Sequence, residues 1–285
     1  MPPGPEGLLA ADRSSSYTVP VVPDAANPER KRAYVRAMFS AIARRYDLLN
    51  SLLSLGLHKR WKRYAVELAT PPPGGLALDV CCGTGDLALL LKERLGPTGR
   101  AVGVDFAEPM VRLARQRGAG LPGVWFVQAD AEALPFPQDS VDVAAVGFGV
   151  RNVARVERAL EELWRVLKPG GRLVVLEFSA PRNRLFAALY DFYSYTVVPW
   201  LGRRLSRHPD AYLYLPTSIR SWPDQDAFAD RLRQAGFVRV GYRNLLFGAV
   251  AVHVADKPGV LPQEPGLARA NSVKTGPTGP REVRR

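Results

Sequence analysis

The chain has 285 residues and a formal net charge of +12, and no apolar run in it reaches the roughly 20 residues that a transmembrane helix needs. Its only cysteines, Cys81 and Cys82, are neighbours, which excludes a disulfide framework and gives no basis for a metal site. The first residues lack the basic stretch and apolar core of a secretion signal, so the sequence predicts a protein of the reducing cytoplasm.

Both ends of the chain have compositions that disfavour a packed core. Residues 1–28 hold several prolines and a run of serines, and residues 258–285 are rich in proline, glycine and arginine. Neither stretch shows apolar periodicity, so we predict that both are disordered tails. The remaining residues, 29–257, are enough for a single α/β domain with accessory helices.

The first predicted helix carries a dense group of positive charges. Apolar residues at 35, 38, 39 and 42 follow helical spacing, and basic residues surround them from Lys31 to Arg63. Such a segment can bind an anionic membrane surface or attract nucleic acid, or it can be an ordinary solvated helix face. Because the sequence has no RNA-binding fold motif, we expect a membrane surface and no nucleic acid as the partner.

The stretch at 77–86, Ala-Leu-Asp-Val-Cys-Cys-Gly-Thr-Gly-Asp, is the most informative one for function. The apolar run at 76–80 predicts a buried parallel strand, which breaks at Gly83 and Gly85 before a helix begins near Leu87. Strand, glycine turn and helix in this order let a ligand approach the backbone closely at the end of the strand. The free N–H groups at the start of the helix can hold an anionic group, such as the carboxylate of an amino-acid-like ligand.

Two acidic residues follow the next two predicted strands. Asp105 ends the strand at 101–104, where a carboxylate can accept hydrogen bonds from both hydroxyls of a ribose. Asp130 follows the strand at 124–129, where its carboxylate can accept a hydrogen bond from the amino group of an adenine. The ligand therefore resembles an adenosine that carries a small charged group. The spacing of the turn also fits a loose nicotinamide-dinucleotide fingerprint, so the turn alone leaves both ligands open.

The rest of the chain completes a sheet. A fourth strand is predicted at 141–146, and a helix that ends at Lys168 is followed by a strand at 172–178. Two further strands at 237–240 and 249–255 flank a predicted turn at 241–248. These last two strands are typical of a hairpin that closes an otherwise parallel sheet.

This pattern resembles the class I S-adenosylmethionine-dependent methyltransferases, in which the Lys-Pro-Gly-Gly turn at 168–171 is also common. More narrowly, residues 46–61 and 165–179 resemble the two signatures of the quinone C-methyltransferases of menaquinone and ubiquinone biosynthesis. The stretches at 133–136 and 147–152 are similar to that family as well, and Leu49 stands where the family usually has Met. The resemblance covers nearly all of residues 29–257.

The resemblance implies a Rossmann-like α/β fold with a seven-stranded, mostly parallel sheet, a terminal antiparallel hairpin and helices on both faces. It implies that the amino-terminal region and an aromatic-rich insertion at about 183–222 form a helical cap. It also implies S-adenosylmethionine as methyl donor, released as S-adenosylhomocysteine, and no metal. We predict that the cofactor site comprises Asp79, Gly83, Thr84, Gly85, Asp105, Asp130, Ala131 and Gly147.

Methylation of a ring carbon in a hydroquinone requires a ring hydroxyl that is at least partly ionised, and hence a base or a cation that stabilises the phenolate. Arg151 and Asn152 follow the fourth strand and are our first candidates, because a guanidinium can lower the pKa of a hydroxyl and an amide can bind its oxygen. Tyr46 and Asp47 come next, on a helix that the resemblance places over the site. His58 is the last candidate, as a base.

The resemblance implies methyl transfer to a ring carbon of a prenylated demethylmenaquinol, giving menaquinol. Gly147 stands where some ubiquinone-pathway relatives have serine, which favours menaquinone over ubiquinone. The alternatives are the equivalent step in ubiquinone biosynthesis, methylation of another prenylated aromatic compound, and a non-catalytic S-adenosylmethionine-binding protein. We expect a peripheral protein on the inner face of the membrane, and a homodimer is compatible with the sequence.

Overall fold

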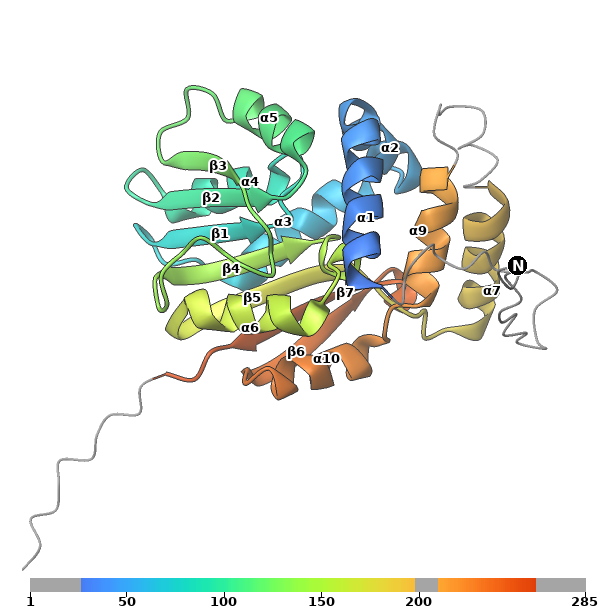
Figure 1. Cartoon of the computed structure of the whole chain (residues 1–285). Coiled ribbons are helices and arrows are strands. Elements are labelled where there is room, and N and C mark those ends of the chain that lie inside the picture. The colour runs from blue at the N-terminus through green and yellow to red at the C-terminus, as the bar shows by residue number, and fades with distance from the viewer. Residues whose placement is uncertain (1–26, 198–209, 260–285) are drawn as a thin grey trace, which may run out of the picture.

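A seven-stranded sheet forms the centre of the structure, a computed structural model that describes residues 27–197 and 210–259 (Figure 1). The strands lie in the order β3-β2-β1-β4-β5-β7-β6. Neighbouring strands from β3 to β5 are parallel, whereas β7 is antiparallel to both β5 and β6. This topology confirms the predicted sheet with its terminal antiparallel hairpin. The strands are β1 (Leu76–Val80), β2 (Arg100–Asp105), β3 (Val124–Gln128), β4 (Val141–Gly147), β5 (Leu167–Phe178), β6 (Val238–Leu245) and β7 (Val250–Asp256).

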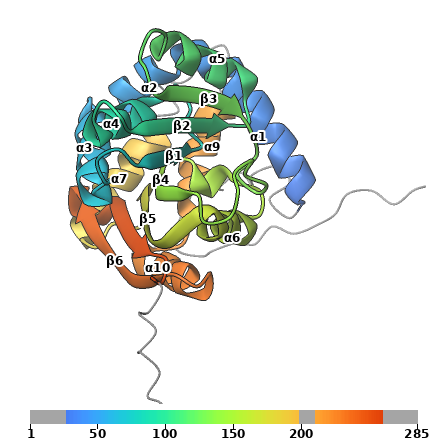
Figure 2. The same cartoon turned by 90° about the vertical axis from the view of Figure 1, so that its left-hand side faces the viewer.

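Helices cover both faces of the sheet, as the view along the strands shows (Figure 2). On one face α3 (Leu57–Ala69) and α4 (Asp86–Leu95) pack against the central strands. On the same face α5 (Glu108–Arg117) packs beside β3 and α4, and on the other face α6 (Val156–Val166) and α10 (Gln225–Gln234) enclose a second apolar core. Because both faces are covered, the central strands read as nearly continuous apolar runs.

The junction between α6 and β5 differs from the prediction. The helix ends at Val166 instead of Lys168, and Leu167 already pairs with Val141 of β4. The next residue of β4 in register, Val143, pairs with Arg172, so the Lys-Pro-Gly-Gly stretch forms an irregular excursion within β5. The sequence pattern predicts that proline and glycine end a helix here, whereas in the structure they form an irregularity within a strand.

The terminal hairpin also differs in detail. The predicted turn at 241–248 is wrong in its first half, because Gly241 to Leu245 continue β6 and pair with β7. β6 is the edge strand and most of its residues are at least partly exposed. Its polar residues therefore do not mark a loop, since one side of an edge strand faces solvent. The true connection is short and comprises Leu246 to Ala249.

Four helices gather beyond the carboxyl ends of the parallel strands and form the cap (Figure 1). They are α1 (Pro28–Ile42), α2 (Tyr46–Leu53), α7 (Arg184–Phe192) and α9 (Asp210–Arg220), joined in part by the short turns η1 (Ala43–Arg45) and η3 (Tyr193–Val197). The side chain of Asn27 caps α1 by accepting the backbone N–H of Glu29 over 3.1 Å. No helix within 27–197 and 210–259 is long and apolar enough to cross a membrane.

Several predictions concern residues outside the described part of the chain. They are most of the two tails, 1–26 and 260–285, and the middle of the aromatic insertion, which contains Trp200, Arg203, Arg204, Arg207 and His208. The described part of the insertion supplies α7, η3 and α9.

One buried lysine, Lys257, fastens the chain at the end of the sheet that lies opposite the cap. The ammonium of Lys257 donates to the carboxylate of Asp139 over 2.6 Å and to the carbonyls of Trp164 and Leu167 over 2.9 and 2.8 Å. It also lies 4.0 Å from the centre of the Trp164 ring. These contacts fasten the chain just after β7 to the end of α6 and the start of β5.

Candidate active site

Left-handed backbone conformations shape the turn after β1. Cys81, Gly83 and Gly85 have φ values of 57°, 54° and 90°. The Gly83 N–H donates to Oδ2 of Asp105 over 2.9 Å, which ties the turn to the end of β2. α4 begins directly after Gly85, so the turn and the first turn of the helix lie at the same edge of the sheet as Asp105.

The two glycines of this turn have different neighbours. A Cβ on Gly83 would meet the Tyr46 ring at 3.6 Å, on the open side of the turn. A Cβ on Gly85 would stand 2.7 Å from the ring of Phe126, and one on Gly103 would stand 2.5 Å from the same ring. Gly83 therefore gives a ligand access to the backbone, whereas Gly85 leaves room for a core aromatic ring.

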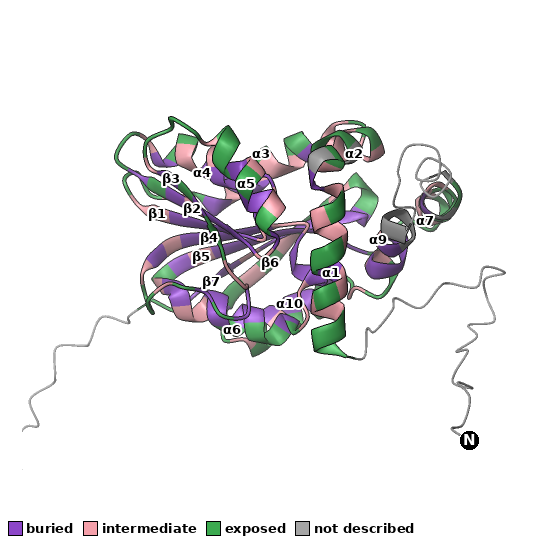
Figure 3. Cartoon of the chain, turned by 45° about the horizontal axis from the view of Figure 1, so that its top comes forward, coloured by how far each residue is buried: buried purple, intermediate pink, exposed green. Residues whose placement is uncertain are grey.

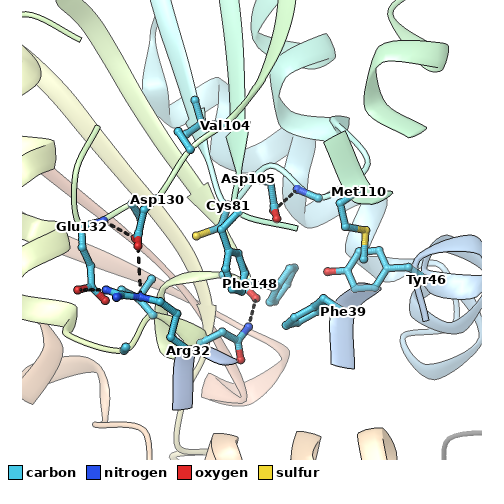
Figure 4. A pocket seen from close by; sticks show the side chains of 18 residues that line it. Arg32, Phe39, Tyr46, Cys81, Val104, Asp105, Met110, Asp130, Glu132 and Phe148 are labelled. Carbon is cyan, nitrogen blue, oxygen red and sulfur yellow. Dashed lines mark hydrogen bonds and ion pairs between the residues drawn. The ribbon is translucent and has the colours of Figure 1, made fainter. Parts of the chain in front are cut away.

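A cleft opens beside this turn, at the carboxyl ends of β1 to β4 (Figure 4). The predicted cofactor residues Gly83, Asp105, Asp130 and Ala131 all line it. Side chains of α1 and α2 close its outer wall, where the rings of Phe39 and Tyr46 meet edge to face with centroids 5.9 Å apart. The apolar part of the lining includes Val104, Phe106 and Met110.

Asp105 points into the cleft from the end of β2 and is nearly buried. Its two oxygens accept the N–H groups of Gly83 and Ala107, each over 2.9 Å. Burial raises the pKa of Asp105, and these two N–H donors oppose that rise. A carboxylate has about four acceptor sites, so both oxygens keep a lone pair for a further donor.

The other predicted cofactor residues lie behind the lining. Thr84 donates its hydroxyl to Oδ1 of Asp47 over 2.7 Å, which joins α2 to the glycine turn. Gly147 leaves room for Leu87, whose Cδ1 would lie 2.7 Å from an added Cβ. Asp79 is almost fully buried, and its Oδ2 accepts the N–H of Ala88 over 2.9 Å. These residues therefore support the lining of the cleft from behind and do not form its surface.

Asp79 gives the fold a specific pH dependence. Burial raises the pKa of Asp79 to about 8, so this carboxyl stays protonated in the folded protein while it ionises in the unfolded chain above about pH 4. The folded state then holds the extra proton, so its stability falls as the pH rises towards 8, by at most about 1.4 kcal/mol per pH unit.

The expected result for Asp79→Asn is a flatter stability profile, because the neutral amide keeps the acceptor for Ala88 and cannot ionise. Urea unfolding between pH 5 and 8 measures this, as a gap between variant and parent that widens with pH in favour of the variant. Parallel profiles would show that Asp79 is already ionised in the folded protein.

Ion pairs between α1 and the segment after β3 cover the end of the cleft at Asp130. Nε of Arg32 on α1 lies 3.3 Å from Oδ2 of Asp130, and its Nη2 donates to Glu132 over 2.7 Å. Nε of Arg155 donates to the same oxygen of Glu132 over 2.7 Å. Sequence analysis missed this cluster: Arg32 was counted as a membrane-facing charge, and its acidic partners lie about a hundred positions away in the sequence.

A neighbouring cation of α1 is also turned inwards. The ammonium of Lys31 donates to the carbonyls of Val153 and Arg151 over 2.7 and 3.2 Å. Burial lowers the pKa of Lys31, and nearby acids including Glu132 oppose this. Two of the basic residues predicted to face a membrane thus fasten α1 to the protein: Lys31 to the segment after β4, and Arg32 to the segment after β3.

A polar network locks α2 over the glycine turn. Arg117 of α5 donates to the Thr84 hydroxyl over 2.9 Å and to Asp86 over 2.6 Å, and Lys62 of α3 donates to Asp86 over 2.7 Å. Burial favours the neutral acid, but Lys62 and Arg117 lower the pKa of Asp86 to about 2. Asp47 joins this network through Thr84, so the structure places it beside the turn and outside the lining of the cleft.

Arg151 is buried with an acidic partner. Its Nη1 donates to Oε1 of Glu177 and, over 2.9 Å, to the carbonyl of Phe148, and the guanidinium lies 5.1 Å from the centre of the Phe178 ring. Its Nε has no hydrogen-bond partner among the described residues. Burial raises the pKa of Glu177, and Arg151 opposes that rise. The structure therefore brings the second family-like stretch, through Glu177, into contact with the first-ranked catalytic candidate.

Asn152 lines the cleft and is held by a residue of the cap. Its Oδ1 accepts the hydroxyl of Tyr214 over 3.0 Å, and its Nδ2 donates to the Phe148 carbonyl over 3.3 Å. The ring of Tyr214 packs against Tyr34 of α1, with centroids 5.7 Å apart. Burial raises the pKa of Tyr214 to about 12, so it is a hydroxyl donor at neutral pH. Sequence analysis recorded Tyr214 only as part of an aromatic-rich insertion.

His58 lies outside the lining of the cleft. It is buried on α3, and its Nδ1 is 2.7 Å from the hydroxyl of Ser54. Burial lowers the pKa of His58, so its imidazole is neutral at neutral pH. Tyr46, by contrast, faces the cleft, and burial raises the pKa of its hydroxyl. Within the described residues, no group of three His, Cys, Asp or Glu side chains could hold a metal ion.

The sheet order, the glycine turn and the acidic residues at the ends of β2 and β3 together define a class I S-adenosylmethionine-dependent methyltransferase fold. Two solved structures have this fold: S-adenosylmethionine-dependent methyltransferases from Thermotoga maritima and Aquifex aeolicus. Their TM-scores are 0.55 and 0.52, with 23% and 20% sequence identity, over 78% and 74% of this chain and 99% and 96% of theirs.

The chain belongs to the ubiE/COQ5 methyltransferase family, which matches residues 27–257. It is 46% identical over 235 residues to the "Ubiquinone/menaquinone biosynthesis C-methyltransferase UbiE" of Ectopseudomonas mendocina (strain ymp). It is 45% identical over 235 residues to the protein of the same name from Pseudomonas fluorescens (strain Pf0-1). Each match covers 81% of this chain and 92% of the relative. The family resemblance drawn from the two sequence signatures is therefore confirmed, and S-adenosylmethionine is the methyl donor that the family implies.

Arg32→Gln is expected to weaken S-adenosylmethionine binding by roughly tenfold, because the loss of its charge-assisted bonds releases Asp130 and loosens α1 over the cleft. Arg36→Gln is the matched control, since Arg36 lies exposed on the same helix and forms no ion pair with another described residue. Isothermal titration calorimetry of the two folded variants measures the difference. Equal affinities would show that the ion pairs serve only to dock α1.

Proposed function

We propose that this protein transfers a methyl group from S-adenosylmethionine to a ring carbon of a prenylated demethylmenaquinol, giving menaquinol and S-adenosylhomocysteine without a metal. The observation that carries the proposal is the cleft itself: a glycine turn, two carboxylates at strand ends and an aromatic outer wall, in a chain of this family. When bound, S-adenosylmethionine supplies a methyl group that its positive sulfur already activates.

The residues present suit this donor. Asp105 offers its remaining lone pairs to the ribose hydroxyls, and Asp130 offers a carboxylate at the end of the adenine pocket. The lack of a side chain at Gly83 leaves the space where the amino-acid part would approach the backbone. Met110 and Phe106 give the pocket apolar walls. In this assignment Asp79, Thr84, Gly85 and Gly147 hold the turn and the strand ends in position.

The acceptor would lie in the part of the cleft lined by Tyr46 and Asn152. The buried cation of Arg151 lowers the cost of ionising the ring hydroxyl, and the Asn152 amide, fixed by Tyr214, positions its oxygen. Precise placement of ring carbon against methyl group can itself supply several orders of magnitude in rate. Asp47 and His58 are second-choice bases, because both lie outside the lining of the cleft and have partners of their own.

The relatives' names include both quinones, so the choice of menaquinone rests on Gly147 alone. A strain that lacks the gene is expected to accumulate demethylmenaquinone and to lose menaquinone, and the gene on a plasmid should restore it. The purified protein should transfer labelled methyl groups from S-adenosylmethionine to demethylmenaquinol. Turnover only on the ubiquinone precursor would move the protein to that pathway, and donor binding without any turnover would favour a non-catalytic role.

The proposal also includes the location of the protein in the cell. The substrate carries a long apolar tail, so we infer a cytoplasmic protein that associates peripherally with the inner face of the membrane, as a monomer or a homodimer. The net charge of +12 supports attraction to an anionic surface.

A further inference from the structure

Two cap helices expose apolar stripes with the same spacing. On α2 and the turn after it, Leu48, Leu52 and Leu55 recur at intervals of four and three residues. On α7, Leu185, Leu189 and Phe192 recur at the same intervals. All six side chains are exposed, Leu55 by 85% and Leu185 by 82%. Intervals of four and three place residues on one face of a helix, so Leu185, Leu189 and Phe192 form one apolar face of α7, and Leu48 and Leu52 share a face of α2. Leu55 lies beyond the end of α2, in a left-handed turn with φ 49°.

The two stripes belong to one end of the molecule. The hydroxyl of Tyr193, directly after α7, donates to the carbonyl of Leu53 at the end of α2 over 2.9 Å. Figure 3 shows α2 and α7 beyond the sheet, each with exposed residues. Phe247, exposed by 66%, extends the surface, because the Phe186 ring of α7 packs on it with centroids 4.9 Å apart. We call the six stripe residues and Phe247 the α2–α7 surface.

Exposed cations flank the α2–α7 surface. Lys59, Arg60 and Arg63 follow Leu55 on the first turns of α3, and Arg184 precedes Leu185 on α7. None of these four side chains forms an ion pair with another described residue. They differ in this from Lys31, Arg32 and Lys62, whose side chains donate to carbonyl or carboxylate oxygens of the protein. These cations are therefore close neighbours in the sequence of the exposed side chains of Leu55 and Leu185, and Arg36 of α1 is a further exposed cation away from that surface.

We propose that the α2–α7 surface is the face with which this protein binds an anionic lipid bilayer, its leucines and phenylalanines entering the acyl boundary and the four cations meeting lipid phosphates. The proposal goes beyond the proposed reaction in naming the surface, and it refines the expectation that the whole stretch from Lys31 to Arg63 faces the membrane. An apolar face with basic residues at its border is the composition that favours such interfacial binding.

Charge complementarity favours a bilayer over a second copy of the chain. A symmetric dimer through this surface would bring the Lys59, Arg60 and Arg184 side chains of two copies towards one another, where like charges repel. An anionic bilayer presents the opposite charge to all of them at once. The surface also lies beyond the same end of the sheet as the cleft that Asn152 lines, so a bilayer bound there would hold its quinol at that end of the molecule.

The test compares two pairs of substitutions at exposed apolar residues. Leu55→Gln with Leu185→Gln alters the α2–α7 surface, whereas Leu121→Gln with Trp125→Gln alters exposed residues at the β3 edge of the sheet. All four positions are exposed, so neither pair removes core packing. Flotation with vesicles of phosphatidylcholine and phosphatidylglycerol should show at least about tenfold weaker binding for the first pair and unchanged binding for the second.

A third variant, Lys59→Gln with Arg60→Gln, should lose most of the preference for phosphatidylglycerol over pure phosphatidylcholine vesicles and most of the salt dependence of binding. Equal vesicle binding by the parent and the Leu55/Leu185 pair would overturn the proposal. So would light scattering that shows a parent dimer and a monomer for that pair with vesicle binding unchanged, because the surface would then be a subunit interface.

The test stands apart from the proposed reaction, because vesicle binding requires no methyl transfer. The Leu55/Leu185 pair should methylate a short-tailed, water-soluble demethylmenaquinol as fast as the parent, and lose rate only on a long-tailed quinol in vesicles. An equal loss on both quinols would also overturn the proposal, since the residues would then act on the cleft. A parent inactive on every quinol would contradict the proposed reaction and leave the vesicle result standing.

Discussion

Arg151→Gln is expected to slow methyl transfer by roughly a hundredfold or more while S-adenosylmethionine affinity stays nearly unchanged. Arg151 does not line the cofactor cleft, so its loss should spare donor binding. Its cation lies beside Asn152, where a phenolate would develop, and the removal of one such stabilising group typically costs this much in rate. The loss should shrink as the pH rises, because more of the quinol then ionises unaided. Single-turnover rates across a pH series measure both effects.

A control is needed because Arg151 also neutralises Glu177. Without it, a buried carboxylate stays unpaired, which costs about 3–5 kcal/mol of stability unless the group takes up a proton. The double variant Arg151→Gln with Glu177→Gln removes both charges and should recover much of that stability, yet it should remain slow. If the double variant regained the parent's rate, or if the pH profile of Arg151→Gln ran parallel to that of the parent, Arg151 would be structural.

Asp105→Ala is expected to weaken S-adenosylmethionine binding by about 2–4 kcal/mol, the equivalent of one or two charge-assisted hydrogen bonds to the ribose. The structure adds a second cause, because the N–H groups of Gly83 and Ala107 lose their acceptor and the glycine turn loosens. Asp105→Asn separates the two, since an amide oxygen can still accept one N–H. Calorimetry measures affinity, with Asp230→Ala as a control at an exposed acid of α10.

An intermediate affinity for Asp105→Asn would show that both the ribose contact and the turn contribute. If folded Asp105→Ala bound the donor as tightly as the parent, the ribose assignment would be lost. An equal loss in both variants would place the whole effect in the negative charge.

The parts of the fold that the sequence predicted are those with local causes. A run such as Leu76 to Val80 becomes a strand because both of its faces are buried, and the turn after it needs glycine for its left-handed conformations. Because parallel strands end at one edge, Asp105 and Asp130 could be expected to meet at a single cleft. Both indeed line it.

The parts that could not be predicted depend on contacts between distant residues. The position of Arg32 in the helical pattern does not indicate that its side chain turns towards Glu132. A basic residue occupies the same kind of position on an amphipathic helix whether its side chain faces solvent or a buried acid. The bond from Tyr214 to Asn152 likewise depends on how the insertion folds back over the sheet. β6 lies at the edge of the sheet and most of its side chains are at least partly exposed, so its sequence lacks the apolar pattern that predicts a strand.

The anchoring of Lys257 has a practical consequence for work with this protein. Its bonds to Asp139, Trp164 and Leu167 hold the chain after β7 at the end of the sheet opposite the cap and the cleft (Figure 1). An affinity tag or a tether to a sensor chip attached after Pro258 therefore leaves the cleft open to solvent. A molecule immobilised in this way is attached at the end opposite its cap, so the cap stays accessible to vesicles flowed across the chip.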